Sequence, residues 1–252
     1  MMEARLYRQS EKGYADCYLC SNRCHIADGK TGVCGVRKNE GGILYSLVYG
    51  RLIAEHIDPI EKKPLFHFQP GTSSYSIATV GCNFRCLHCQ NSEISQMPKD
   101  ANRILGSEAS PEEVVNEAYE TGCSSISYTY TEPTIFFEFA YDTGVIAKEK
   151  GLKNVFVTNG YMTAECVSEL KGVLDAANVD VKSFSETFYK KTCGAALKPV
   201  LDSVERMREA GIWVEITTLL IPGRNDGTDE IRAIAKWITS VDDSMPWHIS
   251  AF

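Results

Sequence analysis

Three cysteines on one short segment are the residues of this chain best suited to binding a metal centre. Cys82, Cys86 and Cys89 have the spacing C-x3-C-x2-C and follow an apolar run, residues 75–80. Such thiolates can hold three irons of a cubane iron–sulfur cluster, which ordinarily takes four cysteines, and one iron then stays open to a substrate. A structural zinc site completed by His88 is the alternative. His88 directly precedes Cys89, which is an awkward place for two ligands of one tetrahedron.

A second group of cysteines lies near the start of the chain. Cys17, Cys20, Cys24 and Cys34 have the spacing C-x2-C-x3-C-x9-C, with several glycines among them. Four thiolates satisfy either a structural zinc ion or a closed second [4Fe–4S] cluster, and the spacing does not separate the two. The site is therefore expected to be a structural metal site or an auxiliary cluster that relays electrons or binds substrate.

The bulk composition restricts the compartment and the partners. The ten cysteines are clustered and no secretory signal precedes them, which favours metal binding over disulfides. Cys123, Cys166 and Cys193 stand alone and are expected to fill the core. The net charge of −7 and the lack of a basic cluster argue against nucleic acid as a partner. No stretch is apolar enough to span a membrane, so a cytoplasmic protein is expected.

The regular part of the sequence alternates strand and helix patterns. Strands are expected at residues 74–80, 125–129, 154–158, 177–181, 213–220 and 247–251. Helices are expected from Ser110-Pro111 onward and at 134–150, 163–174, 200–210 and 229–240. Such alternation predicts parallel βαβ units with right-handed crossovers, here a partial, TIM-like (β/α)6 barrel of the α/β class.

The chain divides into two predicted domains. Residues 1–70 form a cysteine-rich, metal-binding extension, and residues 71–252 form the partial barrel. The chain stops directly after the sixth strand, and its C-terminus is expected to be either truncated or naturally short.

The polar clusters follow the predicted strands, where a barrel gathers its chemistry. The Cys82 loop follows the first strand, and Glu132 follows the second in Tyr-Thr-Glu-Pro. Asn159 ends the third strand in Thr-Asn-Gly, and Asp180-Val-Lys182 ends the fourth. We therefore expect these residues to meet at one mouth of the barrel.

The cysteine motif with its flanking Gly-Cys-Asn resembles that of the radical S-adenosylmethionine (radical SAM) superfamily. Runs such as Cys-His-Ile-Ala-Asp-Gly-Lys-Thr-Gly-Val-Cys-Gly, Asp-Pro-Ile-Glu-Lys-Lys-Pro-Leu and Thr-Tyr-Thr-Glu-Pro-Thr are similar to the radical SAM protein of the AmmeMemoRadiSam system. That group is related to pyruvate formate-lyase activating enzymes, and the resemblance covers nearly the whole chain. One departure is that Tyr130-Thr131-Glu132 stands where the superfamily often has Gly-Gly-Glu, which puts the backbone contacts expected of the glycines in doubt.

The resemblance implies a set of contacts to S-adenosylmethionine. His88 would stack on the adenine, Glu132 would engage the methionine amino group and Lys182 the methionine carboxylate. The complete expected set is His88, Gln90, Glu132, Asn159, Asp180, Lys182 and His248. For His248 a hydrogen-bonded place in the core is an equally good reading.

The resemblance also implies a reaction. Reductive cleavage of S-adenosylmethionine at the [4Fe–4S] cluster would yield a 5′-deoxyadenosyl radical that abstracts hydrogen from a substrate. The activase relationship implies a glycine of a protein partner or an unidentified molecule, and a one-electron donor such as flavodoxin or ferredoxin. Two alternatives stay open: modification of a peptide or small molecule without a glycyl radical, and a non-enzymatic iron–sulfur or zinc protein for electron transfer or assembly.

Overall fold

The computed structural model describes residues 1–252 and confirms the α/β class and the partial barrel. Its central sheet has the strand order β15-β14-β13-β12-β11-β9-β8, and every neighbouring pair except β8–β9 is parallel. The six parallel strands are β9 (Ser73–Ala78), β11 (Ser125–Tyr128), β12 (Lys153–Thr158), β13 (Ala176–Asp180), β14 (Trp213–Leu220) and β15 (Trp247–Ala251). All six lie within two residues of the expected ranges, because the alternation of strand and helix patterns marks where each strand falls.

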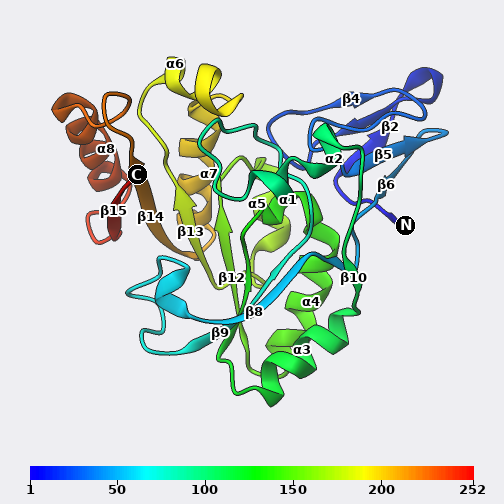
Figure 1. The fold of residues 1–252 in the computed structure, drawn as a ribbon, viewed down its shortest axis with the longest axis horizontal. Helices are drawn as coiled ribbons and strands as arrows, with labels where there is room; N and C mark the ends of the chain where they lie inside the picture. Colours follow the sequence, from blue (N-terminus) through cyan, green and yellow to red (C-terminus); the bar gives the residue numbers. More distant parts are fainter.

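Helices connect the parallel strands as expected (Figure 1). The longer ones are α3 (Pro111–Glu120), α4 (Phe137–Glu149), α5 (Ala164–Leu170), α7 (Lys198–Glu209) and α8 (Thr228–Val241). Helix α3 begins at a capping box in which Ser110 and Glu113 each accept a hydrogen bond from the other's backbone N–H. No helix combines the length and the apolar character that crossing a bilayer requires.

The seventh strand, β8 (Ala54–Pro59), comes from the segment that the sequence assigned to the N-terminal extension. It pairs antiparallel with β9, with Ile57 opposite Tyr75. Only Asp58 of this edge strand is buried, so the segment lacks the apolar pattern that identified the other strands. The sheet therefore begins before residue 70, and the segment between β8 and β9, with the short 3₁₀ helix η2 (Ile60–Lys62), lies below β13 and β14 in Figure 1.

The first fifty residues form small antiparallel sheets on the opposite side of the molecule from β15 (Figure 1). One contains β1 (Met2–Glu3), β6 (Ile43–Ser46) and β5 (Arg37–Glu40), and another contains β2 (Tyr7–Gln9), β3 (Ala15–Cys17) and β4 (His25–Ile26). A further two-stranded pair joins β7 (Arg51–Leu52) to β10 (Ser107–Glu108).

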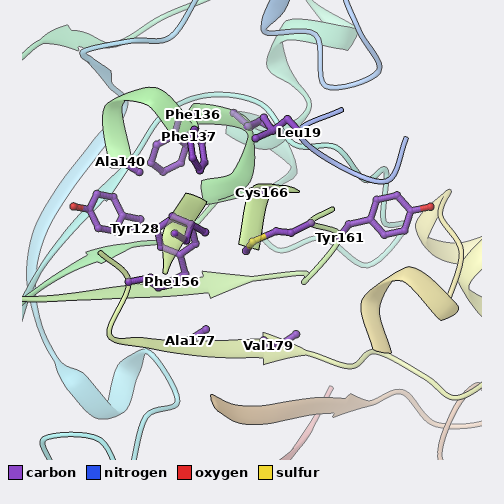
Figure 2. Packing of buried hydrophobic residues seen from close by; sticks show 14 of the residues in the cluster. Leu19, Tyr128, Phe136, Phe137, Ala140, Phe156, Tyr161, Cys166, Ala177 and Val179 are labelled. Carbon is purple, nitrogen blue, oxygen red and sulfur yellow. The ribbon is translucent and has the colours of Figure 1, made fainter. Parts of the chain in front are cut away.

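These sheets share one hydrophobic core with the barrel. Leu19 of the extension belongs to the same cluster of buried residues as Phe137 and Phe156, and Figure 2 shows their side chains in one region. Cys166 of α5 also lies in this core, fully buried. The extension and the barrel therefore bury apolar surface against each other.

Candidate active site

The loop after β9 carries the C-x3-C-x2-C motif and begins at a conformationally demanding position. Gly81 has a φ of +109°, and a Cβ there would lie 2.7 Å from Val36 Cγ1. Only glycine combines that backbone angle with so close an approach. The N-terminal extension, through Val36, thus packs directly against the residue before Cys82.

A cavity of about 650 Å³ opens at the carboxyl ends of the central strands. The residues that line it include all three motif cysteines and six of the seven other predicted site residues. The nine are Cys82, Cys86, Cys89, His88, Gln90, Glu132, Asn159, Asp180 and Lys182. The strand ends thus bring together residues up to a hundred positions apart in the sequence, as expected of a barrel.

The seventh predicted residue, His248, does not line this cavity. It lies on β15 with its ring facing Glu215 of β14, and His248 Nε2 is 2.6 Å from Glu215 Oε2. The position therefore matches the alternative reading of a hydrogen-bonded histidine.

The thiols of Cys82 and Cys89 have hydrogen-bonding groups close by. Cys82 Sγ accepts from the N–H of Phe84 at 3.4 Å and has Asn159 Nδ2 at 3.9 Å. Cys89 Sγ lies 3.4 Å from Ser95 Oγ. Burial, and next the Glu132 carboxylate, raise the pKa of the Cys82 thiol, so a cation is needed to hold the thiolate form. A free thiol site with N–H donors beside it fits a cationic metal centre.

Cys86 differs from Cys82 because a further cysteine lies next to it. The Cys193 thiol, donating its S–H, lowers the pKa of Cys86 to about 7, and Lys182 acts in the same direction. Backbone hydrogen bonds from Arg85 to Cys193 and from Leu87 to Thr192 bring the two segments together. Cys193 is fully buried, as expected of a core cysteine.

Glu132 joins the strand ends to the cysteine loop. Its Oε1 accepts from Thr134 Oγ1 at 2.6 Å and from Thr158 Oγ1 at 2.7 Å, and its Oε2 accepts from the N–H of Asn159 at 2.8 Å. Burial nonetheless raises the pKa of the carboxyl. Asn159 in turn donates to Asn83 Oδ1 at 2.7 Å. One oxygen of a buried carboxylate, Oε2, keeps room for another donor on the cavity side.

Lys182 and Asp180 form a charged pair in the same cavity. Lys182 Nζ donates to Asp180 Oδ2 at 2.8 Å. Burial alone would lower the pKa of Lys182, but Asp180 and the Cys86 sulfur outweigh burial and raise it. The ammonium is thus charged at neutral pH. Its charge, with burial, lowers the pKa of His88, which therefore stays a neutral ring.

Lys63 and Tyr130 also line the cavity, although neither was predicted as a site residue. Lys63, which is almost fully buried, donates to Asp58 Oδ2 at 2.6 Å, and the Tyr130 hydroxyl donates to the same oxygen. Lys63 Nζ also lies 4.6 Å from the centre of the Tyr130 ring. The only signal in the sequence was that Lys63 and Tyr130 belong to the runs that carry the family resemblance.

Tyr130 stands where the superfamily often has a glycine, and its backbone conformation shows how the loop forms without one. Its φ is +60°, in the left-handed region that glycine adopts readily and tyrosine rarely does. The bond to Asp58 and the cation–π contact with Lys63 hold the ring in place. The backbone therefore takes a glycine-like conformation without a glycine.

The four N-terminal cysteines converge in a closed environment. Cys17, Cys20 and Cys34 are buried, Cys24 is half-buried, and all four are free thiols. Burial, with neighbouring thiols, raises the pKa of Cys20 to about 12 and that of Cys34 to about 11. Metal binding must therefore displace protons from these thiols.

A buried cation accompanies this second site. Arg37 donates to Glu138 Oε1 at 2.6 Å, yet its Nε and Nη1 are buried without a hydrogen-bond partner. Burial would lower the pKa of Arg37, but Glu138 and the thiols of Cys17 and Cys34 outweigh burial and raise it. Unpaired donors beside four thiols fit a site that becomes negatively charged when filled.

Sulfur spacing distinguishes the metals that each site fits. The Zn–S bond of about 2.3 Å puts the sulfurs of a zinc tetrahedron about 3.8 Å apart. Only one group of three ligand atoms lies within 4.8 Å of one another, and it contains no cysteine. A cubane cluster spreads its thiolates over different irons, so its sulfurs lie farther apart than those of a zinc tetrahedron.

Comparisons with known proteins agree with this geometry. Residues 76–238 match the radical SAM superfamily. Over its full length the chain is 46% identical to the uncharacterized protein MJ0808 of Methanocaldococcus jannaschii and covers 74% of that protein. It is 24% identical to the pyruvate formate-lyase-activating enzyme of Clostridium pasteurianum over 67% of this chain and 72% of that one.

A solved structure shows the same fold. Streptococcus suis SuiB bound to S-adenosylmethionine superposes with a TM-score of 0.53 at 13% identity, over 68% of this chain and 38% of that one. The match over residues 76–238 spans most of the central sheet and includes the three motif cysteines. The chain therefore belongs to the radical SAM superfamily, whose cofactors are a [4Fe–4S] cluster and S-adenosylmethionine.

Proposed function

We propose that this protein is a radical SAM enzyme of the activase type. The observation that carries the proposal is the cavity in which three free thiols face Glu132, Asn159, Asp180 and Lys182. Cys82, Cys86 and Cys89 would hold the cluster. When bound, the cluster supplies the electron that cleaves a carbon–sulfur bond of S-adenosylmethionine.

The protein's own residues bind and orient the cosubstrate in this proposal. Lys182 stays charged and supplies a cation for the methionine carboxylate, while Asp180 fixes the position of its ammonium. Glu132 Oε2 has one hydrogen-bond partner and accepts from the methionine amino group. His88 is kept neutral, and the buried Nδ1 of its ring has no partner in the protein, so the ring is available to the adenine.

Gln90 and Asn159 complete the proposed binding site in different ways. Gln90 lies at the exposed rim of the cavity, where it can contact the nucleoside. Asn159 is buried and acts through its contacts, because it links Glu132 to Asn83 of the cysteine loop. His248 has no part in this proposal, because it faces Glu215 instead of the cavity.

The substrate of the proposed reaction is a glycine Cα of a protein partner. The support is the likeness to a pyruvate formate-lyase-activating enzyme over two thirds of the chain. A flavodoxin or ferredoxin would supply the electron. Modification of a peptide without a glycyl radical is the second candidate, favoured by the fold shared with SuiB, which was also solved bound to a precursor peptide.

The four N-terminal cysteines are proposed to hold a closed second [4Fe–4S] cluster. The support is the buried Arg37, whose Nε and Nη1 have no hydrogen-bond partner and whose charge interacts with the thiols of Cys17 and Cys34. This site adjoins the first one, because a Cβ at Gly81 would lie 3.4 Å from the carbonyl oxygen of Cys34. A cluster here is placed to pass electrons to the Cys82 site.

Anaerobic reconstitution tests both parts of the proposal. With S-adenosylmethionine and dithionite the protein should form 5′-deoxyadenosine, and Cys82→Ala should form none. An intact reduced cluster without 5′-deoxyadenosine would contradict the enzyme assignment. Candidate partners labelled with deuterium at glycine should transfer deuterium into 5′-deoxyadenosine; transfer from a different position would favour the second candidate. Metal analysis of Cys17→Ser/Cys20→Ser should show a loss of four irons, and a loss of one zinc would refute the second cluster.

A further inference from the structure

Three side chains outside the cavity meet at one point. His67, from the segment before β9, Glu215 of β14 and His248 of β15 place one ligand atom each within 4.8 Å of the others. His248 Nε2 lies 2.6 Å and His67 Nδ1 3.4 Å from the same oxygen, Glu215 Oε2. The two imidazole rings are stacked, with centres 5.8 Å apart. No cysteine contributes to this group.

The Glu215 carboxylate is held in a fixed orientation. It is fully buried, and its Oε1 accepts from the backbone N–H groups of His67 and Phe68 and from Trp213 Nε1, each at 3.0 Å. Phe66 N–H donates to Oε2 at 3.1 Å. Carboxylates that ligate metals are characteristically oriented by hydrogen bonds of this kind. The remaining side of Oε2 faces the two histidines.

Hydrogen bonding alone does not satisfy this arrangement. Six nitrogen atoms lie within hydrogen-bonding distance of Glu215, three on each oxygen. A carboxylate offers about four lone-pair sites, two on each oxygen. On Oε2 the N–H of Phe66 takes one of the two sites, so only one of the two imidazoles can donate to the other site. A metal ion removes this conflict, because it takes the lone pairs of both imidazole nitrogens and needs no proton on either.

We propose that His67, Glu215 and His248 bind a divalent transition-metal ion. Two imidazoles and one carboxylate suit zinc or iron(II) and leave coordination positions open. The His67 side chain is 57% exposed, so water can complete the coordination sphere. This proposal is independent of the radical chemistry, because none of the three residues lines the cavity.

The ion would fasten the segment between β8 and β9 to the last two strands of the sheet. That segment supplies Lys62 and Lys63 to the cavity, and β15 supplies Ser250 and Ala251. The proposed site is the point at which the segment meets both β14 and β15. Metal binding would therefore stabilise, from outside the cavity, two of the segments that line it.

Cobalt(II) is the probe that tests the site in the cluster-loaded protein. In that form the cysteines of the clusters are occupied, and oxidised [4Fe–4S] clusters give no EPR signal that would hide high-spin cobalt. After a chelator wash we expect one Co²⁺ per chain, with imidazole nitrogen couplings in pulsed EPR. Competition by Zn²⁺ and by Fe²⁺, measured separately, identifies the preferred ion.

Substitution of His67 tests whether the metal ion binds at this group of residues. His67→Gln should weaken Co²⁺ binding at least tenfold and remove one nitrogen coupling, and Zn²⁺ should raise the Tm of the wild type but not of this variant. Since His67 is exposed, this variant folds even if Glu215→Gln does not. His25→Gln is the control, because His25 lies 2.5 Å from the carboxylate of Asp16 without a second imidazole. Equal Co²⁺ binding in the wild type and His67→Gln, or cobalt without nitrogen couplings, would overturn the proposal.

Discussion

Cys82, Cys86 and Cys89 lie on the wall of a cavity, whereas three of the four N-terminal cysteines are buried in the packing between the small sheets and the barrel. Both sets are free thiols. The cavity site has three motif cysteines together with polar side chains, and the N-terminal site has four cysteines. Both sites use cysteine ligands. Under the proposed function, the number of cysteines and their exposure to the cavity would separate a site that binds a substrate from a site that does not.

The two sites also differ in how buried charge is balanced. Beside the N-terminal cysteines, Arg37 keeps two donors without a partner. At the cavity, Lys182 is paired with Asp180, and Lys63 with Asp58. Under the proposed function, the unpaired donors of Arg37 would balance the charge of a permanently bound group, and the paired charges of the cavity would exchange partners with a ligand that binds and leaves.

The largest expected effect is the difference in 5′-deoxyadenosine formation between a variant of the cavity site and a variant of the N-terminal site. Cys82→Ser should abolish 5′-deoxyadenosine formation, because it removes a ligand from the cluster that contacts S-adenosylmethionine. Cys20→Ser should retain formation driven by dithionite but lose turnover driven by a flavodoxin or ferredoxin, measured by product chromatography. Cys123→Ser, a buried cysteine outside both sites, is the control. If Cys82→Ser and Cys20→Ser lost 5′-deoxyadenosine formation equally with dithionite, the two cysteine sites would not have different roles in cleavage.

Arg37→Met tests the buried charge of the closed site. Removing one partner of a buried ion pair leaves Glu138 uncompensated and should cost about 3–5 kcal/mol of unfolding free energy. Denaturant unfolding of the anaerobic, cluster-loaded protein measures it. Arg206→Met, which removes only an exposed pair with Asp202, should change stability by less than about 1 kcal/mol. Similar losses in the two variants would show that the Arg37 pair contributes no more than a surface pair.

Asp58→Asn tests the paired charges of the open site through pH. Burial would raise the pKa of Asp58, but Lys62, Lys63 and Tyr130 outweigh burial and lower it. A carboxyl whose folded pKa is depressed stabilises above its unfolded pKa of about 3.9 and loses that contribution as pH falls through the folded value. The variant should therefore lose about 1–3 kcal/mol at pH 7.

The difference between wild type and Asp58→Asn should shrink below about pH 4, as measured by urea unfolding at several pH values. Asp202→Asn, at an exposed ion pair, provides the reference. A difference that stays constant down to pH 2 would mean that the Asp58 charge does not carry the effect.

The smallest expected effect concerns the cosubstrate. Lys182→Met should raise the Kd for S-adenosylmethionine about tenfold, as the loss of one charged hydrogen bond predicts. Isothermal titration of the cluster-loaded protein measures it, and iron content should not change. Lys190→Met, at an exposed pair with Glu186, is the matched control. Unchanged affinity would remove Lys182 from the proposed binding site.

Much of the fold could be predicted because its signals are local. The six parallel strands are short segments that alternate with helical patterns, and Ser110-Pro111-Glu112-Glu113 marks the start of α3 before any tertiary contact is known. Strand β8 could not be predicted, since an edge strand with one buried residue has no apolar period. The short helices α1 (Ser92–Ser95), α2 (Met97–Asp100) and α6 (Glu186–Phe188) are likewise too brief to show a helical period.

Site residues that directly follow a strand could be predicted. Contacts between side chains of different strands or loops could not. Glu132, Asn159 and Lys182 follow strands, and the parallel topology alone brings them together. The contact of His248 with Glu215 depends on side-chain direction, which alternates along β14 and β15 and is not fixed by motif position. The pairing of Cys86 with Cys193 joins residues over a hundred positions apart, and no spacing rule links them.

The left-handed backbone at Tyr130 has a consequence for comparing relatives of this protein. A search for the Gly-Gly-Glu letters would pass over this loop, although its backbone has the shape that glycine usually provides. Such a loop requires a positive φ at this position. Tyr130 can adopt it because its side chain is held by Asp58 and Lys63. Alignments of this loop are therefore better scored by conformation than by residue identity.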